Sequence, residues 1–332
     1  MKKVLLNKVI AVTVSIAFSG FIWFLLPATA TQPWIIMDLK GLTLSKQEEW
    51  MLKHPSVAGV ILTLANSYGN PSIGGKKYPS LESVRQLVAS IRHIRPSLLI
   101  CIDYEGGYIS RIEDKKLPQI PLLSERLQSV TEQNRRAVSF QQGQQTGRIL
   151  KSLDIDVLLG PVLDISVAGH PLEKRAIASS PDLVAQYGSA YAEGVISEGI
   201  TTAIKHFPGL GYTQEDTHHA QAFDTRSSQE IFGSMQPFTS LINRGTKMIM
   251  PSHAIYPAID NTPATYSAKW HQILRQDLGF KGKIITDDTS MGGLDKRNLS
   301  FAEHIESIHQ AGNDFVLIMH KQDKLYSYLK KT

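Results

Sequence analysis

Short apolar runs recur along the chain and are separated by longer amphipathic stretches. From Trp34 onward, eight runs of five to eight residues are dominated by apolar or β-branched side chains, and this length and composition are typical of buried strands. The runs are residues 34–39, 57–64, 98–103, 156–163, 201–206, 246–251, 283–287 and 314–319. Because the spaces between them leave room for helices, the pattern predicts an α/β fold.

Several of the intervening stretches begin with a helix-capping signal. A Ser followed three residues later by Glu occurs at Ser45, Ser227 and Ser300, and this pair satisfies backbone N–H groups at the start of a helix. Eight strands that alternate with helices predict a (β/α)8 TIM barrel, a fold that takes about 250 residues as one domain. An open, doubly wound sheet is the alternative arrangement of the same elements.

The first 30 residues differ from the rest of the chain. They combine a basic start, an apolar stretch over residues 9–26 and the small-x-small sequence Ala-Thr-Ala at residues 28–30, which together are typical of a signal peptide. The apolar stretch, at about 18 residues, is also long enough to span a bilayer. We therefore expect residues 1–30 to be a signal peptide or an N-terminal membrane anchor, with cleavage favoured. Residues 31–332 are then the folded domain of an exported protein, periplasmic or extracellular.

Charge and cysteine content narrow the class of protein further. The formal charge is +5, but three of the lysines lie in the first 30 residues, so the remainder has 32 basic and 30 acidic residues, or +2. No basic run indicates nucleic-acid binding. Cys101 is the only cysteine, so the chain has no disulfide framework. Its place inside an apolar run indicates a buried strand residue.

Polar residues follow the ends of four predicted strands. Because the active site of a barrel lies at the carboxyl ends of its strands, we expect these groups to share one face. They are Asp103 after the third run, Lys205 and His206 at the end of the fifth, Ser252 and His253 after the sixth, and Asp287 at the end of the seventh. A scaffold that served stability alone would not need this concentration, so it indicates a functional site.

The loop after the fifth run contains the sequence Asp216-Thr217-His218. An Asp and a His two residues apart in an extended loop can point the same way, so that the carboxylate bonds one ring nitrogen and leaves the other free for proton transfer. A solvated surface loop is the alternative interpretation. Two carboxylates follow the seventh run, and because side chains alternate along a strand, only one of Asp287 and Asp288 is expected to face the site.

Together these motifs resemble glycoside hydrolase family 3, in particular its single-domain β-N-acetylglucosaminidases. The resemblance rests on KHFPGLG at residues 205–211, the Asp-x-His that follows it, and GFKGKIITDD at residues 279–288. It implies a retaining, exo-acting glycosidase that removes terminal β-linked N-acetylglucosamine from cell-wall fragments or chitooligosaccharides through a covalent intermediate. It also implies that Asp287 is the nucleophile and that His218, supported by Asp216, is the general acid/base.

The same resemblance implies a set of sugar-binding residues, in which charged side chains hold the hydroxyl groups of a terminal sugar. They are Asp103, Arg111, Arg175, Lys205 and His206. Two positions depart from the family's pattern. Tyr108 stands where the family has the first Arg of D-x-E-G-G-R-V-x-R, and Leu210 stands where it usually has the His of PGHG. The G-x-R element of the family is Glu173-Lys174-Arg175 here.

Metal and nucleotide sites are not indicated by the sequence. The chain lacks the helical His pair and the Cys pairs of zinc sites, and neither GxGxxG nor GxxxxGK(S/T) occurs, so no metal or cofactor is expected. We expect a monomer whose partner is a small glycan, and no nucleic acid. The competing hypothesis is a catalytically inactive, exported glycan-binding protein on the same fold, which the departures at Tyr108 and Leu210 make conceivable.

Overall fold

The eight apolar runs form the eight strands of one parallel sheet in the computed structural model. The strands are β1 (Ile35–Leu39), β2 (Val57–Leu64), β3 (Leu99–Ile102), β6 (Val157–Val162), β7 (Thr201–Phe207), β8 (Met248–Pro251), β11 (Lys283–Ile284) and β12 (Val316–Ile318). Their order in the sheet is β11-β8-β7-β6-β3-β2-β1-β12, and every neighbouring pair is parallel. A further parallel bridge between Ile285 and Phe315 connects the two ends of this order. The sheet therefore curls, consistent with a TIM-like barrel and not with the open alternative.

The structure describes residues 32–64, 77–294 and 298–332, and residues 32–332 form one compact unit. The predicted signal peptide or anchor at residues 1–30 lies outside the described residues. None of the helices in the described ranges is both long and apolar enough to cross a membrane.

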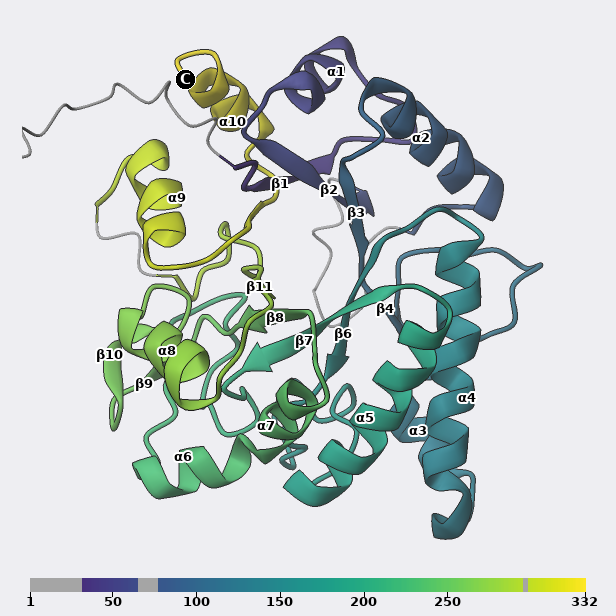
Figure 1. Cartoon of the computed structure of the whole chain (residues 1–332), viewed down its shortest axis with the longest axis vertical. Coiled ribbons are helices and arrows are strands. Elements are labelled where there is room, and N and C mark those ends of the chain that lie inside the picture. The colour runs from purple at the N-terminus through teal and green to yellow at the C-terminus, as the bar shows by residue number, and fades with distance from the viewer. Residues whose placement is uncertain (1–31, 65–76, 295–297) are drawn as a thin grey trace, which may run out of the picture. The chain divides into compact units, whose positions relative to one another are not determined.

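Each strand of the sheet is followed by one or more helices, which lie around the outside of the sheet (Figure 1). They are α1 (Lys46–Lys53), α2 (Leu81–Ile94), α3 (Leu123–Gln128), α4 (Glu132–Lys151), α5 (Pro181–Ser197), α6 (Ser228–Ser234), α7 (Gln236–Asn243), α8 (Ala268–Gln272) with a π-helical turn at Ile273–Asp277, α9 (Phe301–Gln310) and α10 (Gln322–Leu329). Two small hairpins extend the loops at the carboxyl ends of β3 and β8. They are β4 (Tyr104–Gly106) with β5 (Ile109–Ser110), and β9 (Ile255–Tyr256) with β10 (Asp260–Pro263).

The three predicted capping signals all begin helices. Ser45, Ser227 and Ser300 precede α1, α6 and α9, and each forms a complete capping box with the Glu three residues later. The Ser hydroxyl accepts the N–H of that Glu, whose carboxylate accepts the N–H of the Ser. Two backbone donors at each helix start are thereby satisfied.

The strands are buried on both faces, which explains why their sequences are continuously apolar rather than alternating. One apolar cluster draws its buried residues from the sheet strands and their immediate extensions. Its members are Ile36, Ala58, Ile61, Cys101, Val157, Leu159, Ala203, Met248, Met250, Ile285 and Leu317. Alternate strand residues, such as Ile35 and Met37, belong to the larger cluster that includes the helices. Cys101 is fully buried, as predicted, and burial raises the pKa of its thiol.

Candidate active site

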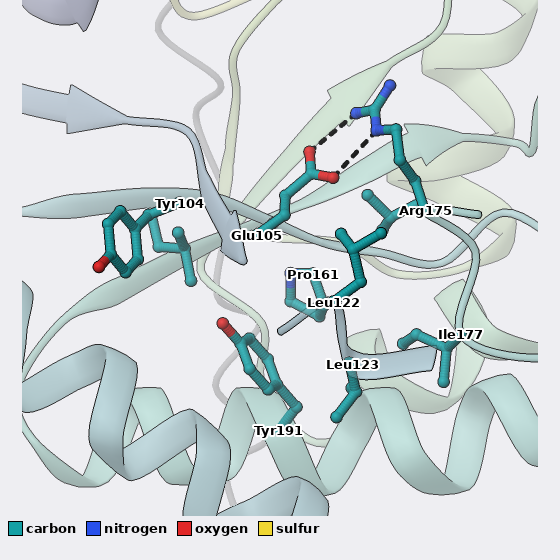
Figure 2. A pocket seen from close by; sticks show the side chains of 11 residues that line it. Tyr104, Glu105, Leu122, Leu123, Pro161, Arg175, Ile177 and Tyr191 are labelled. Carbon is teal, nitrogen blue, oxygen red and sulfur yellow. Dashed lines mark hydrogen bonds and ion pairs between the residues drawn. The ribbon is translucent and has the colours of Figure 1, made fainter. Parts of the chain in front are cut away.

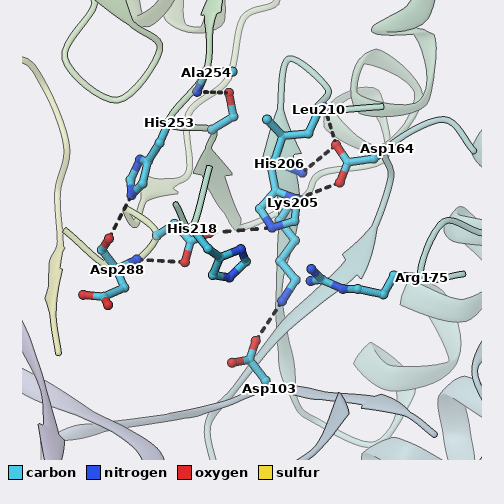
Figure 3. A network of polar contacts seen from close by, with 12 residues as sticks. Asp103, Asp164, Arg175, Lys205, His206, Leu210, His218, His253, Ala254 and Asp288 are labelled. Carbon is cyan, nitrogen blue, oxygen red and sulfur yellow. Dashed lines mark hydrogen bonds and ion pairs between the residues drawn. The ribbon is translucent and has the colours of Figure 1, made fainter. Parts of the chain in front are cut away.

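The polar residues predicted from the strand ends meet at the carboxyl end of the sheet. Asp103 follows β3, Lys205 and His206 lie in the last part of β7, and Asp287 follows β11. Loops from β6 and β7 bring Arg175 and His218 to the same place (Figure 3). Parallel strands explain this meeting, because their carboxyl ends share one edge whatever their separation in sequence.

Three cations and two carboxylates form a network at the ends of β3 and β7. Lys205 Nζ lies 2.7 Å from Asp103 Oδ1 and 2.8 Å from Glu105 Oε1. Arg111 Nη2 lies 3.4 Å from the other oxygen of Asp103. Arg175 donates to both carboxylate oxygens of Glu105, at 2.9 and 2.8 Å (Figure 2). The network therefore has one positive charge in excess. It contains four of the five predicted sugar-binding residues, namely Asp103, Arg111, Arg175 and Lys205, together with Glu105.

The attraction within this network outweighs the cost of burying its carboxylates. Burial disfavours the ionised form of Glu105, but Arg175 and Lys205 hold its pKa at about 2. The pKa of Asp103 also lies well below its ordinary value, because the charges of Lys205 and Arg111 exceed the effect of burial. Lys205 is only 3% exposed, yet the two carboxylates raise its pKa. These shifts keep Asp103, Glu105 and Lys205 charged at neutral pH, and such charged donors and acceptors suit sugar hydroxyls.

An apolar pocket lies beside the pair formed by Arg175 and Glu105 (Figure 2). It has about 350 Å³ of empty space, and its lining includes Leu122, Pro161 and Ile177. Apolar walls lower the local dielectric constant, which strengthens the charge pair. The bidentate contact therefore holds the Arg175 side chain in one orientation towards the site.

His206 connects a buried carboxylate to the predicted nucleophile. Its Nδ1 lies 2.6 Å from Oδ2 of Asp164, which is fully buried, and its Nε2 lies 3.7 Å from Oδ2 of Asp287. Burial opposes ionisation of Asp164, but His206 outweighs it and lowers the pKa of the carboxyl. The other oxygen of Asp164 accepts the backbone N–H of Leu210 at 2.7 Å. Leu210 is thus held by its backbone, and its side chain is 5% exposed.

Asp216 and His218 form the compact pair that their spacing suggested. His218 Nδ1 lies 2.6 Å from Asp216 Oδ1, and the same oxygen accepts the backbone N–H of His218 at 2.9 Å. Burial disfavours the protonated ring, but the hydrogen bond to Asp216 and the charge of Asp287 outweigh it and raise the pKa of His218. The pKa of Asp216 falls to about 2, because hydrogen bonds from His218 outweigh burial. Asp216 thus occupies Nδ1 of the imidazole, and its Nε2 takes no part in these contacts.

Asp287 and Asp288 point in different directions, as expected for adjacent residues at a strand end. Asp287 is 24% exposed and lines the pocket described below. Burial opposes its ionisation, but the favourable electrostatic effect of nearby side chains, that of His206 the largest, outweighs burial and lowers the pKa of Asp287. The Asp288 carboxylate instead accepts the N–H and hydroxyl of Ser290, at 2.9 and 2.5 Å. Burial raises the pKa of Asp288 to about 7.

The acid/base pair, the predicted nucleophile and two of the sugar-binding candidates line one pocket. It has about 290 Å³ of empty space, and its walls come from the loops after β6, β7 and β11. The residues of this pocket are His170, Pro171, Leu172, Arg175, His206, Leu210, Thr213, Glu215, Asp216, Thr217, His218 and Asp287. Asp103, Arg111 and Lys205 adjoin it through the charge network. Within the described residues, no group of three or more His, Cys, Asp or Glu side chains is arranged to hold a metal ion.

Sequence reasoning missed several residues that shape the site. Glu105 follows Asp103 by two residues and so lies on the same side of the chain, and Asp164 directly follows the fourth apolar run. Each therefore carried a signal in its position at a strand end. His253, by contrast, was predicted at the end of the sixth run, but it is buried and does not line the pocket. Thr265 Oγ1 lies 2.7 Å from its Nδ1, and the carbonyl of Asp288 lies 3.0 Å from its Nε2. Burial lowers the pKa of His253 to about 4, so it supports the strand end as a neutral ring.

The curled parallel sheet thus brings a carboxylate, Asp287, and a carboxylate-supported imidazole, His218, to one pocket. Residues 28–332 match the glycosyl hydrolase family 3 N-terminal domain. The chain belongs to this family. Two predictions are confirmed by this match and by the relatives below, namely the family and a glycosidase of the β-N-acetylhexosaminidase type.

Relatives of known name agree with the family match. The β-hexosaminidase of Actinobacillus succinogenes is 35% identical over 301 residues, which cover 89% of this chain and 83% of that protein. The β-hexosaminidase of Nitrosomonas eutropha is 37% identical over 300 residues, covering 87% and 81%. A solved structure of NagZ from Neisseria gonorrhoeae, in complex with N-trifluoroacetyl-D-glucosamine, superposes with a TM-score of 0.78 at 28% identity, covering 90% of this chain and 85% of that one.

Proposed function

We propose that the protein is a retaining, exo-acting β-N-acetylglucosaminidase. The observation that carries this proposal is the single pocket lined by Asp287, His218 and Asp216 together with Arg175 and His206. A double-displacement reaction needs a nucleophile and a general acid/base, and the lowered pKa of Asp287 and the raised pKa of His218 suit these two roles. The β-hexosaminidase relatives and the sugar derivative bound by the NagZ structure support the choice of substrate.

In this mechanism Asp287 attacks the anomeric carbon of the terminal sugar while His218 protonates the leaving oxygen. The C–O bond to the leaving group breaks as the bond to Asp287 Oδ forms, which gives a covalent glycosyl-enzyme. His218, now neutral, removes a proton from water as the water attacks the same carbon, and Asp287 departs as a carboxylate. Asp216 keeps Nδ1 protonated throughout, so that Nε2 is the atom that gives and takes the proton.

Sugar recognition falls to the charge network. Asp103, with two cations beside it, accepts hydrogen bonds from hydroxyl groups, while Lys205 and Arg175 donate to hydroxyl or acetamido oxygens. Lys205 pairs with Asp103 and Glu105, and Arg175 pairs with Glu105, so these side chains are fixed before substrate arrives and little rotamer entropy is lost on binding.

We further propose cell-wall fragments or chitooligosaccharides outside the cytoplasm as the substrates of a monomeric enzyme. The basic, apolar and small-residue pattern of residues 1–30 supports export. Cell fractionation with N-terminal sequencing, and light scattering for the mass of the purified protein, test these points. Recovery of the full-length chain from the cytosol would contradict export.

Turnover of a nitrophenyl β-N-acetylglucosaminide tests the activity itself and separates the enzyme from the inactive glycan-binding alternative. Proton NMR of the first-formed product then distinguishes retention from inversion at the anomeric carbon. A 2-fluoro sugar with a good leaving group should label Asp287, because it slows breakdown of the covalent intermediate more than its formation. An inverted first product, or a label on Asp288, would refute the mechanism.

A further inference from the structure

A histidine that the proposed reaction does not use lies in the wall of the catalytic pocket. His170 belongs to the loop between β6 and α5, which also carries Arg175. Its Nε2 lies 3.1 Å from Oγ1 of Thr213. Thr213 belongs to the loop between β7 and α6, which carries Asp216 and His218. His170 therefore connects the loop with a sugar-binding candidate to the loop with the acid/base pair.

The contacts of His170 define the state of its ring. The backbone N–H of Leu172 donates to Nδ1 at 3.1 Å, so Nδ1 carries no proton. Burial lowers the pKa of His170, and the neutral ring then has its proton on Nε2, which donates to the Thr213 hydroxyl. That hydroxyl donates onward to the carbonyl of Leu210, at 3.0 Å, or of Glu215, at 3.3 Å. Every group in this chain of hydrogen bonds has a consistent donor and acceptor role.

Both ends of this series of hydrogen bonds lie close to functional groups. Leu172, which donates to the ring, accepts the backbone N–H of Arg175 at 2.9 Å. Glu215, at the other end, directly precedes Asp216. The ring thus joins backbone segments that immediately flank one sugar-binding candidate and the acid/base pair.

The far side of the acid/base loop is held by a different element. The backbone N–H of Gly292 donates to the carbonyl of His218 at 3.0 Å, and that of Gly293 donates to the carbonyl of Thr217 at 2.8 Å. A Cβ atom at Gly292 would lie 2.4 Å from the His219 carbonyl oxygen, so only glycine permits this approach. The loop is therefore held on the nucleophile side by backbone contacts. Before Asp216 it is held by two side chains, since Asp164 accepts the backbone N–H of Leu210 and His170 contacts Thr213.

We propose that His170 is a positioning residue. It holds the loop of Asp216 and His218 in a fixed position relative to the loop that carries Arg175. The proposal rests on the proposed role of His218 as acid/base. Through Thr213, His170 fixes the first half of the loop, and loss of this contact lets His218 Nε2 move away from the leaving oxygen. The ion pairs of Asp103 and Lys205 involve neither His170 nor Thr213.

The test compares His170→Ala and Thr213→Val in the full chain, with an activated nitrophenyl glycoside and an alkyl glycoside as substrates. The alkyl leaving group needs protonation and the nitrophenol does not, so misplacement of His218 is seen mainly with the alkyl glycoside. We expect kcat with the alkyl glycoside to fall about tenfold more than with the nitrophenyl glycoside, as for one lost hydrogen bond, with little change in KM. The double variant should change the ratio of the two rates little more than the worse single variant does, because both substitutions remove the same contact between His170 and Thr213.

His54→Ala is a matched control. His54 is also a half-buried histidine whose Nδ1 accepts a backbone N–H two residues later, that of Ser56 at 3.2 Å, and burial also lowers its pKa. It precedes β2 and so lies at the amino end of the strands, away from the pocket. Its replacement should leave the ratio of the two rates unchanged.

Equal losses with both substrates, or a change in the ratio no larger than that of the control, would overturn the proposal. If His170→Ala does not fold, Thr213→Val alone decides, since valine keeps the shape of threonine and removes only the hydroxyl. The variant His218→Ala distinguishes failure of the proposed function from failure of the proposal for His170. If the ratio of the two rates is unchanged in His218→Ala, both are wrong. If the ratio changes strongly in His218→Ala but not in His170→Ala or Thr213→Val, only the proposal for His170 is wrong.

Discussion

Replacing Lys205 by Met should destabilise the protein in a way that depends on pH. Lys205 is 3% exposed and lies 2.7 and 2.8 Å from carboxylate oxygens of Asp103 and Glu105. Methionine keeps the length of the side chain and removes the charge. Breaking a buried ion pair typically costs about 3–5 kcal/mol, and because Arg111 and Arg175 remain beside the carboxylates, we expect the lower end. For a domain of this size, that corresponds to a fall in Tm of about 6 °C.

The sign of the pH dependence follows from the pKa of Glu105. In the native protein this pKa is about 2, below the value of about 4.3 in an unfolded chain, so its contribution is present above pH 4.3 and lost as the pH falls through 2. Without Lys205, burial and the repulsion between Asp103 and Glu105 raise their pKa values. A carboxyl group whose pKa in the folded protein lies above its pKa in the unfolded chain stabilises the folded state at low pH. That stabilisation is lost as the pH rises through the pKa of the folded protein. The Tm difference between variant and wild type should therefore be larger near pH 7 than near pH 4.5.

Thermal unfolding followed by circular dichroism at these two pH values measures both effects. Lys40→Met is the control, because Lys40 pairs with Asp323 at 3.3 Å but the two side chains are 52% and 85% exposed. Such a surface pair is worth less than about 1 kcal/mol. A Tm loss in Lys205→Met no larger than in the control, or one that is equal at both pH values, would refute the view that Lys205 neutralises two buried carboxylates.

Three further predictions concern the reaction. His218→Ala should lower kcat by about 10²–10⁴ with alkyl glycosides and far less with nitrophenyl glycosides, so equal losses would argue against an acid role. Asp287→Asn should abolish turnover of both substrates, whereas Asp288→Asn should keep activity within about tenfold because that carboxyl faces Ser290; a reversed order in the same assay would exchange their roles. Asp216→Asn keeps a hydrogen-bond acceptor for His218 Nδ1 but removes the negative charge that helps to raise the pKa of His218, so the alkaline limb of the kcat/KM profile should move to lower pH. A limb that stays in place would assign it to another group.

The sheet is readily predicted from the sequence because its strands are buried on both faces and therefore appear as uninterrupted apolar runs. Boundaries are less certain where the chain leaves the sheet early. The seventh run spans residues 283–287, but β11 ends at Ile284, and Ile285 makes only a single bridge to Phe315. The hairpins β4–β5 and β9–β10 have strands of two to four residues, too short for any periodicity to be detected.

Residues of the site are easier to predict than their partners. Asp216 and His218 are two positions apart, so their contact is local and can be inferred from spacing. Glu105 and Arg175 are 70 positions apart, and Asp164 and His206 are 42 apart. Such pairs depend on which strands become neighbours in the sheet, and a single sequence shows the strand ends without showing the distances between them.

The charge network offers a physical reason for an imidazole, and not a carboxyl group, as the proposed acid. A carboxylic acid must keep its proton to serve as a general acid, which requires a raised pKa. Near Arg175 and Lys205 the opposite happens, since Glu105 has its pKa lowered to about 2 beside these cations. An imidazole is affected differently, because Asp216 and Asp287 raise the pKa of His218 and keep its proton in place. His218 in turn contributes to the lowered pKa of Asp287, so each member of this pair shifts the pKa of the other in the direction that its proposed role requires.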